Sequence, residues 1–241
     1  EMYWHMMVND DNGVVARGMA LHKMIRLVTI ATINGGYLDF MGNEFGHPEW
    51  IDFPREGNGW SYKYARRQWD LVDREDLKYK YLNAFDNAMV ELVSGVYDFQ
   101  SLPVDKLWEK DDDQVLAFRR GDLVFVFNWN PVKSFTDYGF LAPAGEYEVV
   151  MDSDARCFGG FGNVEDRMHH FTQDDPLYSP SGKGWLKLYI PARSAQVLRM
   201  IKAKPRRKTV KKEEKPVVAD STAAKAGAKT ASKPGRKKKA E

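Results

Sequence analysis

Apolar residues recur at helical spacing in two segments of the first hundred residues. The first predicted helix runs from Val14 to about Ile33. The second is predicted to be capped by Asp73 and stopped by Gly95. Its predicted buried stripe consists of Leu77, Tyr81, Ala84, Phe85, Ala88 and Leu92.

Between these helices lies the apolar run Tyr37–Met41, which predicts a buried strand, followed by a loop rich in polar and aromatic residues. A helix followed at once by a strand is typical of a parallel α/β unit. One strand with two helices cannot close a barrel, which needs eight strands. Residues 1–98 are therefore predicted to be the incomplete end of a TIM-type α/β barrel.

Beyond Phe99 the pattern changes to short alternating runs divided by turns, as in an antiparallel sandwich. Residues 99–202 are therefore predicted to be an all-β sandwich that folds on its own, and the pair Gly121-Asp122 is predicted to form a hairpin turn. The predicted strands are Val115–Arg119, Leu123–Asn128, Glu146–Met151, Trp185–Ile190 and Ala195–Ile201.

Composition separates a folded part from a basic tail. The chain has 241 residues, is 43% hydrophobic and has a net charge of +2. Residues 203–241 hold 14 Lys or Arg and four Asp or Glu, a charge of +10, which leaves −8 on the rest. The tail is predicted to be disordered. It contains no aromatic residues between its basic residues to stack on bases, so we expect no specific nucleic-acid recognition.

The single cysteine, Cys157, excludes an internal disulfide and CxxC chemistry, and it is expected to pack as a small hydrophobe. The apolar stretches are shorter than the roughly 20 residues that span a bilayer. No secretory signal opens the sequence, so we expect no membrane partner and a cytoplasmic location.

The run MGNEFGHPEW at residues 41–50, followed by IDFPREGN and YARRQWDL, resembles the eighth barrel strand and next loop of 1,4-alpha-glucan branching enzymes of the α-amylase superfamily. DSDARCFGG at 152–160 and YIPARSA at 189–195 extend the resemblance over about residues 1–201. It implies that the sandwich is the C-terminal β-domain of that superfamily. It also implies that no metal or organic cofactor is required.

Enzymes of that superfamily carry a nucleophilic Asp, an acid/base Glu and a stabilising Asp after barrel strands 4, 5 and 7. The opening segment resembles the stretch after the strand 7 motif, and the first residue is Glu1 rather than Met. We therefore expect no catalytic residue in this chain. The missing N-terminal part of the same enzyme is its expected partner, and the chain alone is expected to be inactive.

The loop after the predicted strand supplies the candidate substrate-binding residues Glu44, His47, Trp50, Arg55 and Trp60. Flat rings stack on sugar faces and charged groups bind hydroxyls. Packing of the loop onto the barrel is the alternative for each aromatic side chain. For Glu44 the alternative, which we favour, is that it ties the loop to neighbouring strands. No third ligand accompanies the histidine, so no metal site is expected.

Three other features have structural and functional interpretations. Arg66 or Arg67 is expected to bridge the loop to acidic barrel residues. The pair His169-His170 is expected to lie in a solvated loop. Alternation in the last hairpin places Trp185 on the wetter strand face, which makes it the best candidate for a second glucan contact.

The sequence thus predicts the C-terminal part of a branching enzyme, which transfers an α-1,4-glucan segment to a 6-hydroxyl in glycogen or starch. That reaction is a retaining transglycosylation. The alternatives are a noncatalytic glucan-binding β-sandwich protein or another enzyme of the α-amylase superfamily.

Overall fold

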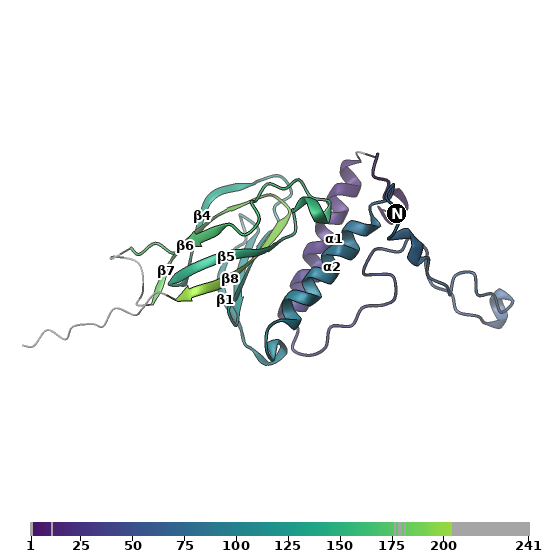
Figure 1. The fold of residues 1–241 in the computed structure, drawn as a ribbon, viewed down its shortest axis with the longest axis horizontal. Coiled ribbons are helices and arrows are strands. Elements are labelled where there is room, and N and C mark those ends of the chain that lie inside the picture. Colours follow the sequence, from purple (N-terminus) through teal and green to yellow (C-terminus); the bar gives the residue numbers. More distant parts are fainter. Residues whose placement is uncertain (1, 11, 176, 178–179, 181, 204–241) are drawn as a thin grey trace, which may run out of the picture. The chain divides into compact units, whose positions relative to one another are not determined.

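The structure is a computed structural model that describes residues 2–10, 12–175, 177, 180 and 182–203 (Figure 1). Two long helices precede a set of eight strands. The predicted disordered tail, apart from its first residue, lies outside the described residues. The elements are α1 (Gly13–Thr32), α2 (Tyr79–Ser94), β1 (Val104–Lys110), β2 (Val115–Arg120), β3 (Leu123–Asn128), β4 (Phe135–Pro143), β5 (Gly145–Asp152), β6 (His169–Phe171), β7 (Lys183–Ile190) and β8 (Ser194–Ala203).

The strands form the two antiparallel sheets that the alternating pattern predicts. One sheet has the order β1-β2-β3-β8-β5-β6, and β4 pairs with β7 in the other. All five predicted strands are present, and β2 and β3 join through Gly121, whose φ of 63° suits a tight turn. The all-β antiparallel sandwich is therefore confirmed.

Three strands have no sequence counterpart among those predicted. Strand β1 is only half-buried, so its hydrophobic alternation is weak. Strand β4 has an irregular register near Asp137, whose φ of 55° interrupts the extended backbone. Strand β6 has three residues at the sheet edge, so the prediction that His169-His170 lie in a solvated loop is wrong.

The six-stranded sheet is covered on both faces. Val124 and Val126 of β3 pack with strands β4 and β7, whereas Phe125 and Phe127 pack with Met24 of α1 and with α2. Every residue of β3 is consequently buried. Figure 1 shows α1 and α2 side by side next to the sandwich, and residues 1–98 and the sandwich share this core.

The buried guanidinium of Arg120 on β2 joins the sheet to the end of α1. It donates to the carbonyl oxygens of Ala31 at 3.0 Å and Ile33 at 2.9 Å, which the end of the helix leaves without intrahelical partners. It also donates to Gln100 O at 2.6 Å and lies over the ring of Phe99. One side chain therefore fixes α1, β2 and the connection into β1.

The first helix matches its prediction, and Asn12 caps it through a bond from Val14 N at 2.9 Å. The second begins at Tyr79, so Asp73 is not its cap. Residues before it are instead held by a bond from Lys78 N to Met6 O at 2.7 Å. Gly95 does stop the helix. The predicted stripe is confirmed in part: Leu77 and Phe85 are buried, and Tyr81, Ala88 and Leu92 are partly buried against the core. The fully buried positions within the helix are Tyr79, Leu82, Phe85, Asp86, Met89 and Val93.

The predicted barrel strand Tyr37–Met41 is not a strand in this structure. Leu38 is 93% exposed, and Phe40 and Met41 are exposed as well. A strand needs a neighbour to pair its backbone groups, and no described residue pairs with this segment in a sheet. An apolar run alone could not reveal that the neighbour is missing.

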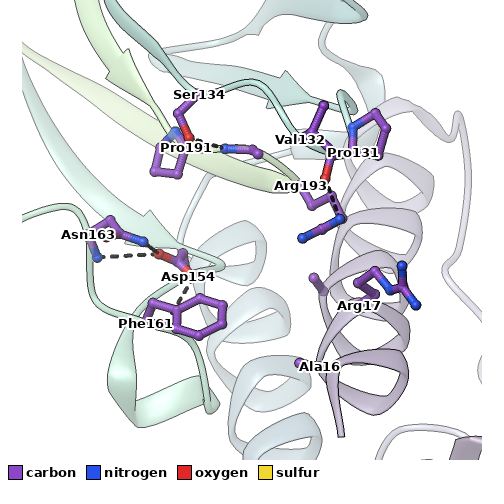
Figure 2. Close-up of a pocket in the computed structure, with 13 residues that line it drawn as sticks. Ala16, Arg17, Pro131, Val132, Ser134, Asp154, Phe161, Asn163, Pro191 and Arg193 are labelled. Carbon is purple, nitrogen blue, oxygen red and sulfur yellow. Dashed lines mark hydrogen bonds between the residues drawn. The ribbon is translucent and has the colours of Figure 1, made fainter.

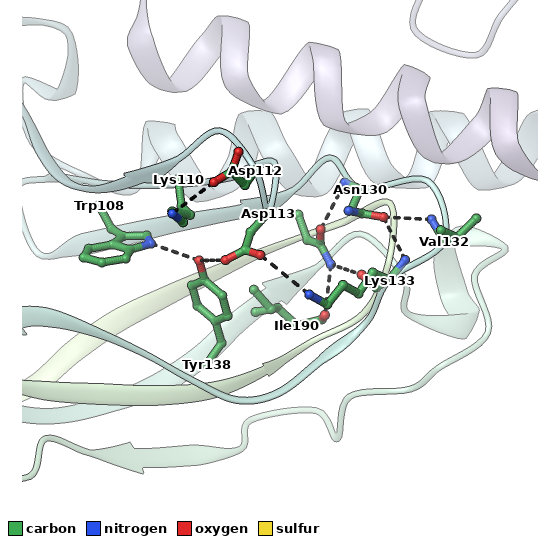
Figure 3. Close-up of polar contacts among 10 residues, drawn as sticks. Trp108, Lys110, Asp112, Asp113, Asn130, Val132, Lys133, Tyr138 and Ile190 are labelled. Atoms are coloured by element: carbon green, nitrogen blue, oxygen red, sulfur yellow. Dashed lines mark hydrogen bonds and ion pairs between the residues drawn. The ribbon is translucent and has the colours of Figure 1, made fainter.

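A buried amide holds the connections at one end of the sandwich. The Nδ2 of Asn128 donates to the carbonyl oxygens of Lys133, Ile190 and Pro191 at 2.9, 3.1 and 2.9 Å. Figure 3 shows the continuation, in which Trp108 and Asp113 both bond to the Tyr138 hydroxyl. These bonds satisfy polar groups beside the core and fix the β3–β4 and β7–β8 connections.

The segment after β5 is attached to α1 by a buried lysine. Lys23 Nζ donates to Ser153 O and, at 2.9 Å, to Phe158 O. Burial lowers the pKa of Lys23 to about 8 and raises the pKa of Asp152 to about 7. In the same segment Cys157 is exposed, so the expectation that it packs as a hydrophobe is wrong.

Asp152 predicts a pH dependence of folding. Its folded pKa of about 7 exceeds the ordinary 3.8, so the native state binds more protons between these values and stability falls as pH rises from 4 to 7. Lys23 stays protonated in both states over that range. Asp152→Asn should reduce this fall in the free energy of unfolding by at least about 1 kcal/mol.

Urea denaturation of the full chain at several pH values measures the effect. Asp166→Asn is the control, because Asp166 is exposed in the same segment and should leave the profile unchanged. If the free energy of unfolding of Asp152→Asn depends on pH as that of the wild type does, the raised pKa of Asp152 is contradicted.

Candidate functional site

The candidate loop joins α1 to α2 and contains two short 3-10 helices, Glu56–Asn58 and Trp69–Leu71. Arg67 joins two parts of this loop, residues 49–50 and Tyr64. Nη1 donates to Glu49 O at 3.0 Å, and Nη2 donates to Tyr64 O at 2.7 Å and Trp50 O at 3.3 Å. The expected bridge to acidic barrel residues is therefore not seen among the described residues, and Arg67 instead binds backbone carbonyls of its own loop.

His47 is buried at the base of the loop. Its Nδ1 lies 2.9 Å from Arg67 Nη1 and 3.1 Å from Glu49 O, and its Nε2 accepts from Gln68 N at 3.2 Å. Burial lowers the pKa of His47 and favours the neutral ring. Because both ring nitrogens face partners inside the loop, these contacts favour a structural role over a reach toward substrate.

Glu44 also bonds within the loop, accepting from Gly42 N at 2.8 Å. Its charge raises the pKa values of Tyr37 and Asp86, although burial is the main cause of both increases. This places Glu44 next to a polar cluster at the base of the loop. The tie from Glu44 to neighbouring strands, which the sequence favoured, stays a prediction.

The other three predicted residues are exposed along the loop. Trp50 is 61% exposed and stacks on Tyr64, with ring centroids 5.2 Å apart. Trp60 is 65% exposed, and its backbone N donates to Arg55 O at 3.0 Å. Trp50, Arg55 and Trp60 are therefore exposed to a ligand in solution, whereas His47 is mostly buried and lines a cavity between α1 and the loop. The substrate contacts of all four residues stay a prediction.

The tip of the loop is held by Asp52. Its carboxylate accepts from Arg55 Nε at 2.9 Å and from Asn58 Nδ2 at 3.0 Å. These two bonds lower the pKa of Asp52. Trp60 has a φ of 62°, an unusual backbone conformation for a tryptophan, at the end of this turn. The tip thus presents a large aromatic side chain from an ordered turn.

A polar cluster beneath the loop was not predicted. Arg26 of α1 forms ion pairs with Asp39 and, at 3.1 Å, with Asp86 of α2. Burial raises the pKa of Asp86 despite this arginine. The arginine therefore connects both helices to the segment that was predicted as a strand. Nothing in the spacing of these residues along the chain indicates that they meet.

A cavity of about 330 Å³ lies beside this cluster, between α1 and the loop. The Tyr3 hydroxyl and His22 Nδ1 are 2.9 Å apart in its wall, and burial lowers the pKa of His22 to about 4. His22 Nε2 is buried with no hydrogen-bond partner among the described residues. A neutral imidazole thus leaves one polar atom available at the base of the loop.

A second cavity, of about 680 Å³, lies between α1 and the sandwich (Figure 2). Arg17 of α1 and Arg193 of the β7–β8 turn line one side, and Asp154 and Phe161 line the other. The two motifs DSDARCFGG and YIPARSA therefore both line this cavity, through Asp154 and Arg193. None of the predicted site residues lines it, although the motifs themselves were a usable signal.

The His, Cys, Asp and Glu side chains of the described residues do not gather into a metal site. Within the described ranges, no three His, Cys, Asp or Glu side chains are grouped so as to hold a metal ion. No helix in that part of the chain is long and apolar enough to cross a membrane. The chemistry of the loop is that of exposed aromatic rings with hydrogen-bonding groups, as a polar organic ligand requires.

Comparisons with known proteins identify the sandwich and the chain. Residues 108–201 match the family described as the α-amylase C-terminal all-β domain, and this segment belongs to that class. Most of the chain, outside its C-terminal tail, is similar to 1,4-alpha-glucan-branching enzymes. The enzyme of Emericella nidulans is 47% identical over 201 residues, which are 82% of this chain and 29% of that protein.

The chloroplastic/amyloplastic branching enzyme of Oryza sativa is 51% identical over 183 residues, 73% of this chain and 22% of that protein. The chain thus spans less than a third of these relatives. Among solved structures, the match to a Nostoc punctiforme debranching enzyme covers 76% of this chain and 31% of that enzyme's chain, at 15% sequence identity. The TM-score of this match is 0.46, and no argument rests on it.

The contacts of Arg67 predict its effect on the loop. Arg67→Ala removes the donor shared by three backbone carbonyls, so amide hydrogen exchange in residues 47–68 should accelerate by roughly tenfold or more. Arg66→Ala is the matched control, since Arg66 is adjacent and exposed. Mass spectrometry of exchanged peptides measures both. Equal exchange in the two variants would show that Arg67 does not hold the loop.

Proposed function

We propose that this chain is the C-terminal part of a 1,4-alpha-glucan-branching enzyme, which transfers an α-1,4-glucan segment to a 6-hydroxyl. The names of its homologues support the activity. Retaining transglycosylation requires two carboxylates roughly 5 Å apart. In this proposal the part of the longer protein outside the chain provides them. The loop of Trp50, Arg55 and Trp60 contributes contacts to the glucan.

The concentration of exposed apolar side chains on the first 69 residues is the observation that carries the proposal. Among the described residues, 14 of the 24 exposed large hydrophobic side chains lie there. Soluble proteins rarely leave contiguous apolar surface uncovered. The sandwich, although longer, has fewer such residues. We infer that the remaining part of the same protein covers these side chains, and that residues 1–98 complete an α/β barrel with it.

Helix α1 illustrates the need for a second covering layer. Its inward residues Met24 and Leu27 are fully buried in the core shared with the sandwich. Leu21 and Ile25, one turn apart on a different face, are 39% and 55% exposed. A helix that is apolar on two faces is suited to lie between two layers. The sandwich supplies one layer, and the barrel would supply the other.

The segment predicted as the eighth strand fits the same proposal. Leu38, Phe40 and Met41 are all exposed, and their backbone lacks strand partners among the described residues. Neighbouring barrel strands would pair this backbone and bury the side chains. The cytoplasmic location stays a prediction, as does the division at residues 98 and 202. The polymer is glycogen or starch, and the sequence does not choose between them.

The activity test compares this chain with the longer protein that contains it. Incubation with amylose should yield α-1,6 linkages, measured as short chains released by isoamylase, for the longer protein only. Branched product from the chain alone, or none from the longer protein, would contradict the proposal.

A variant pair tests the covered face. Ile25→Gln should destabilise the longer protein by about 2 kcal/mol and lower its activity, yet change the chain alone by less than about 0.5 kcal/mol. Val132→Gln is the control, because Val132 is 84% exposed on the sandwich and should be neutral in both. Equal small effects of Ile25→Gln in both proteins would show that nothing covers α1.

A further inference from the structure

The sandwich has an open cavity apart from the loop. It has a volume of about 510 Å³ and lies between β7 and the segment that follows β6. One aromatic side chain, one amide, one ammonium and two carboxylates surround it, from Gln173, Asp174, Asp175, Trp185 and Lys187. None of these residues belongs to the loop between α1 and α2. A ligand here would bind independently of the predicted substrate loop.

The backbone of Trp185 is fixed on both sides. Its N–H donates to Gln173 O at 2.8 Å, and its carbonyl accepts from Gln173 N at 2.9 Å. On the other side it pairs with Leu141 of β4. The neighbouring residues Leu186 and Leu188 are buried in the core. The indole therefore projects from a rigid strand, and little conformational entropy is lost when it binds.

The ring lies beside a glycine of the adjacent strand. A Cβ atom at Gly139 would lie 3.5 Å from Trp185 Cε3 and 3.5 Å from Lys187 Cγ. The indole and the lysine stem thus cover the bare backbone of β4. The Lys187 ammonium is held by Asp137 Oδ2 at 3.1 Å. The aromatic surface and the cationic donor are consequently both in place before a ligand arrives.

The mixture of groups indicates the chemistry of the ligand. Lys187 is already paired with Asp137, so it offers no unpaired charge to an anion. A nucleic-acid surface needs an excess of cations, which this cavity lacks. A neutral ring with one apolar C–H face and hydroxyls at its edge satisfies both parts of the wall. The C–H face packs on the indole, and the hydroxyls bond to the amide, ammonium and carboxylates.

We propose that Trp185, with Gln173 and Lys187, forms a noncovalent subsite for pyranose rings of an oligosaccharide. The narrower statement that the sugar is an α-1,4-glucan rests on the proposed function. The subsite holds the polymer on the sandwich and takes no part in bond cleavage. A polymer bound here raises the local concentration of its other segments near the rest of the protein.

The test measures binding of maltoheptaose to the full 241-residue chain by isothermal titration calorimetry. Trp185→Ala should weaken binding by roughly tenfold or more. Tyr189→Ala is the matched control, since Tyr189 is an exposed aromatic residue on the same face of β7 and does not line the cavity. It should bind as the wild type does. Circular dichroism establishes that each variant is folded.

A second variant serves if Trp185→Ala does not fold. Gln173→Ala leaves the backbone bonds to Trp185 intact and should weaken binding roughly threefold, the loss of one hydrogen bond. Wild-type affinity in both cavity variants would overturn the proposal, as would an equal loss in Tyr189→Ala. Failure of the chain to bind maltoheptaose, with binding of cellohexaose through Trp185, would overturn the α-glucan assignment and leave the pyranose subsite.

The outcome is separable from that of the proposed function. In one outcome the longer protein forms α-1,6 linkages, but Trp185→Ala binds maltoheptaose as tightly as the wild type. That result contradicts the subsite and leaves the branching proposal intact. In the other outcome maltoheptaose binding depends on Trp185, but the longer protein forms no α-1,6 linkages. That result contradicts the branching proposal and leaves the subsite intact.

Discussion

The packing of α1 and α2 against the outer face of the six-stranded sheet is the interaction on which the other features depend. Phe118, Phe125 and Phe127 form a continuous row of stacked rings on that face. Burying each such ring contributes roughly 1.5 to 3 kcal/mol, so exposing the row would remove much of the stability of a domain. The sandwich thus requires the helices, although its strands alone look self-sufficient in sequence.

This shared core explains the position of the polar groups that cross it. Arg120 and Lys23 are both almost fully buried, and each donates to carbonyl oxygens of a segment distant in sequence. Burying a charged side chain is costly unless several hydrogen bonds offset it. Both residues therefore connect elements that apolar packing has already brought together. Through α1, they also fix the start of the loop that carries Trp50 and Trp60.

The sequence was informative where hydrophobic alternation or a capping residue decided the structure. Strand β3 was predicted at its observed bounds, and α1 within one residue at each end. The strand at residues 37–41 failed because pairing depends on other strands. Strand β4 was missed because an irregular register obscures its alternation. For His47, residue type indicated a binding role, whereas the structure places both ring nitrogens against partners within the loop.

The central claim is that the helices and the sandwich unfold as one unit, and native-state hydrogen exchange tests it most directly. The amides of Leu27 in α1 and Phe125 in β3 should show the same opening free energy and the same urea dependence, because both are buried in the same core. A clearly lower opening free energy for Leu27, with Phe125 still protected, would show that the sandwich is stable without the helices.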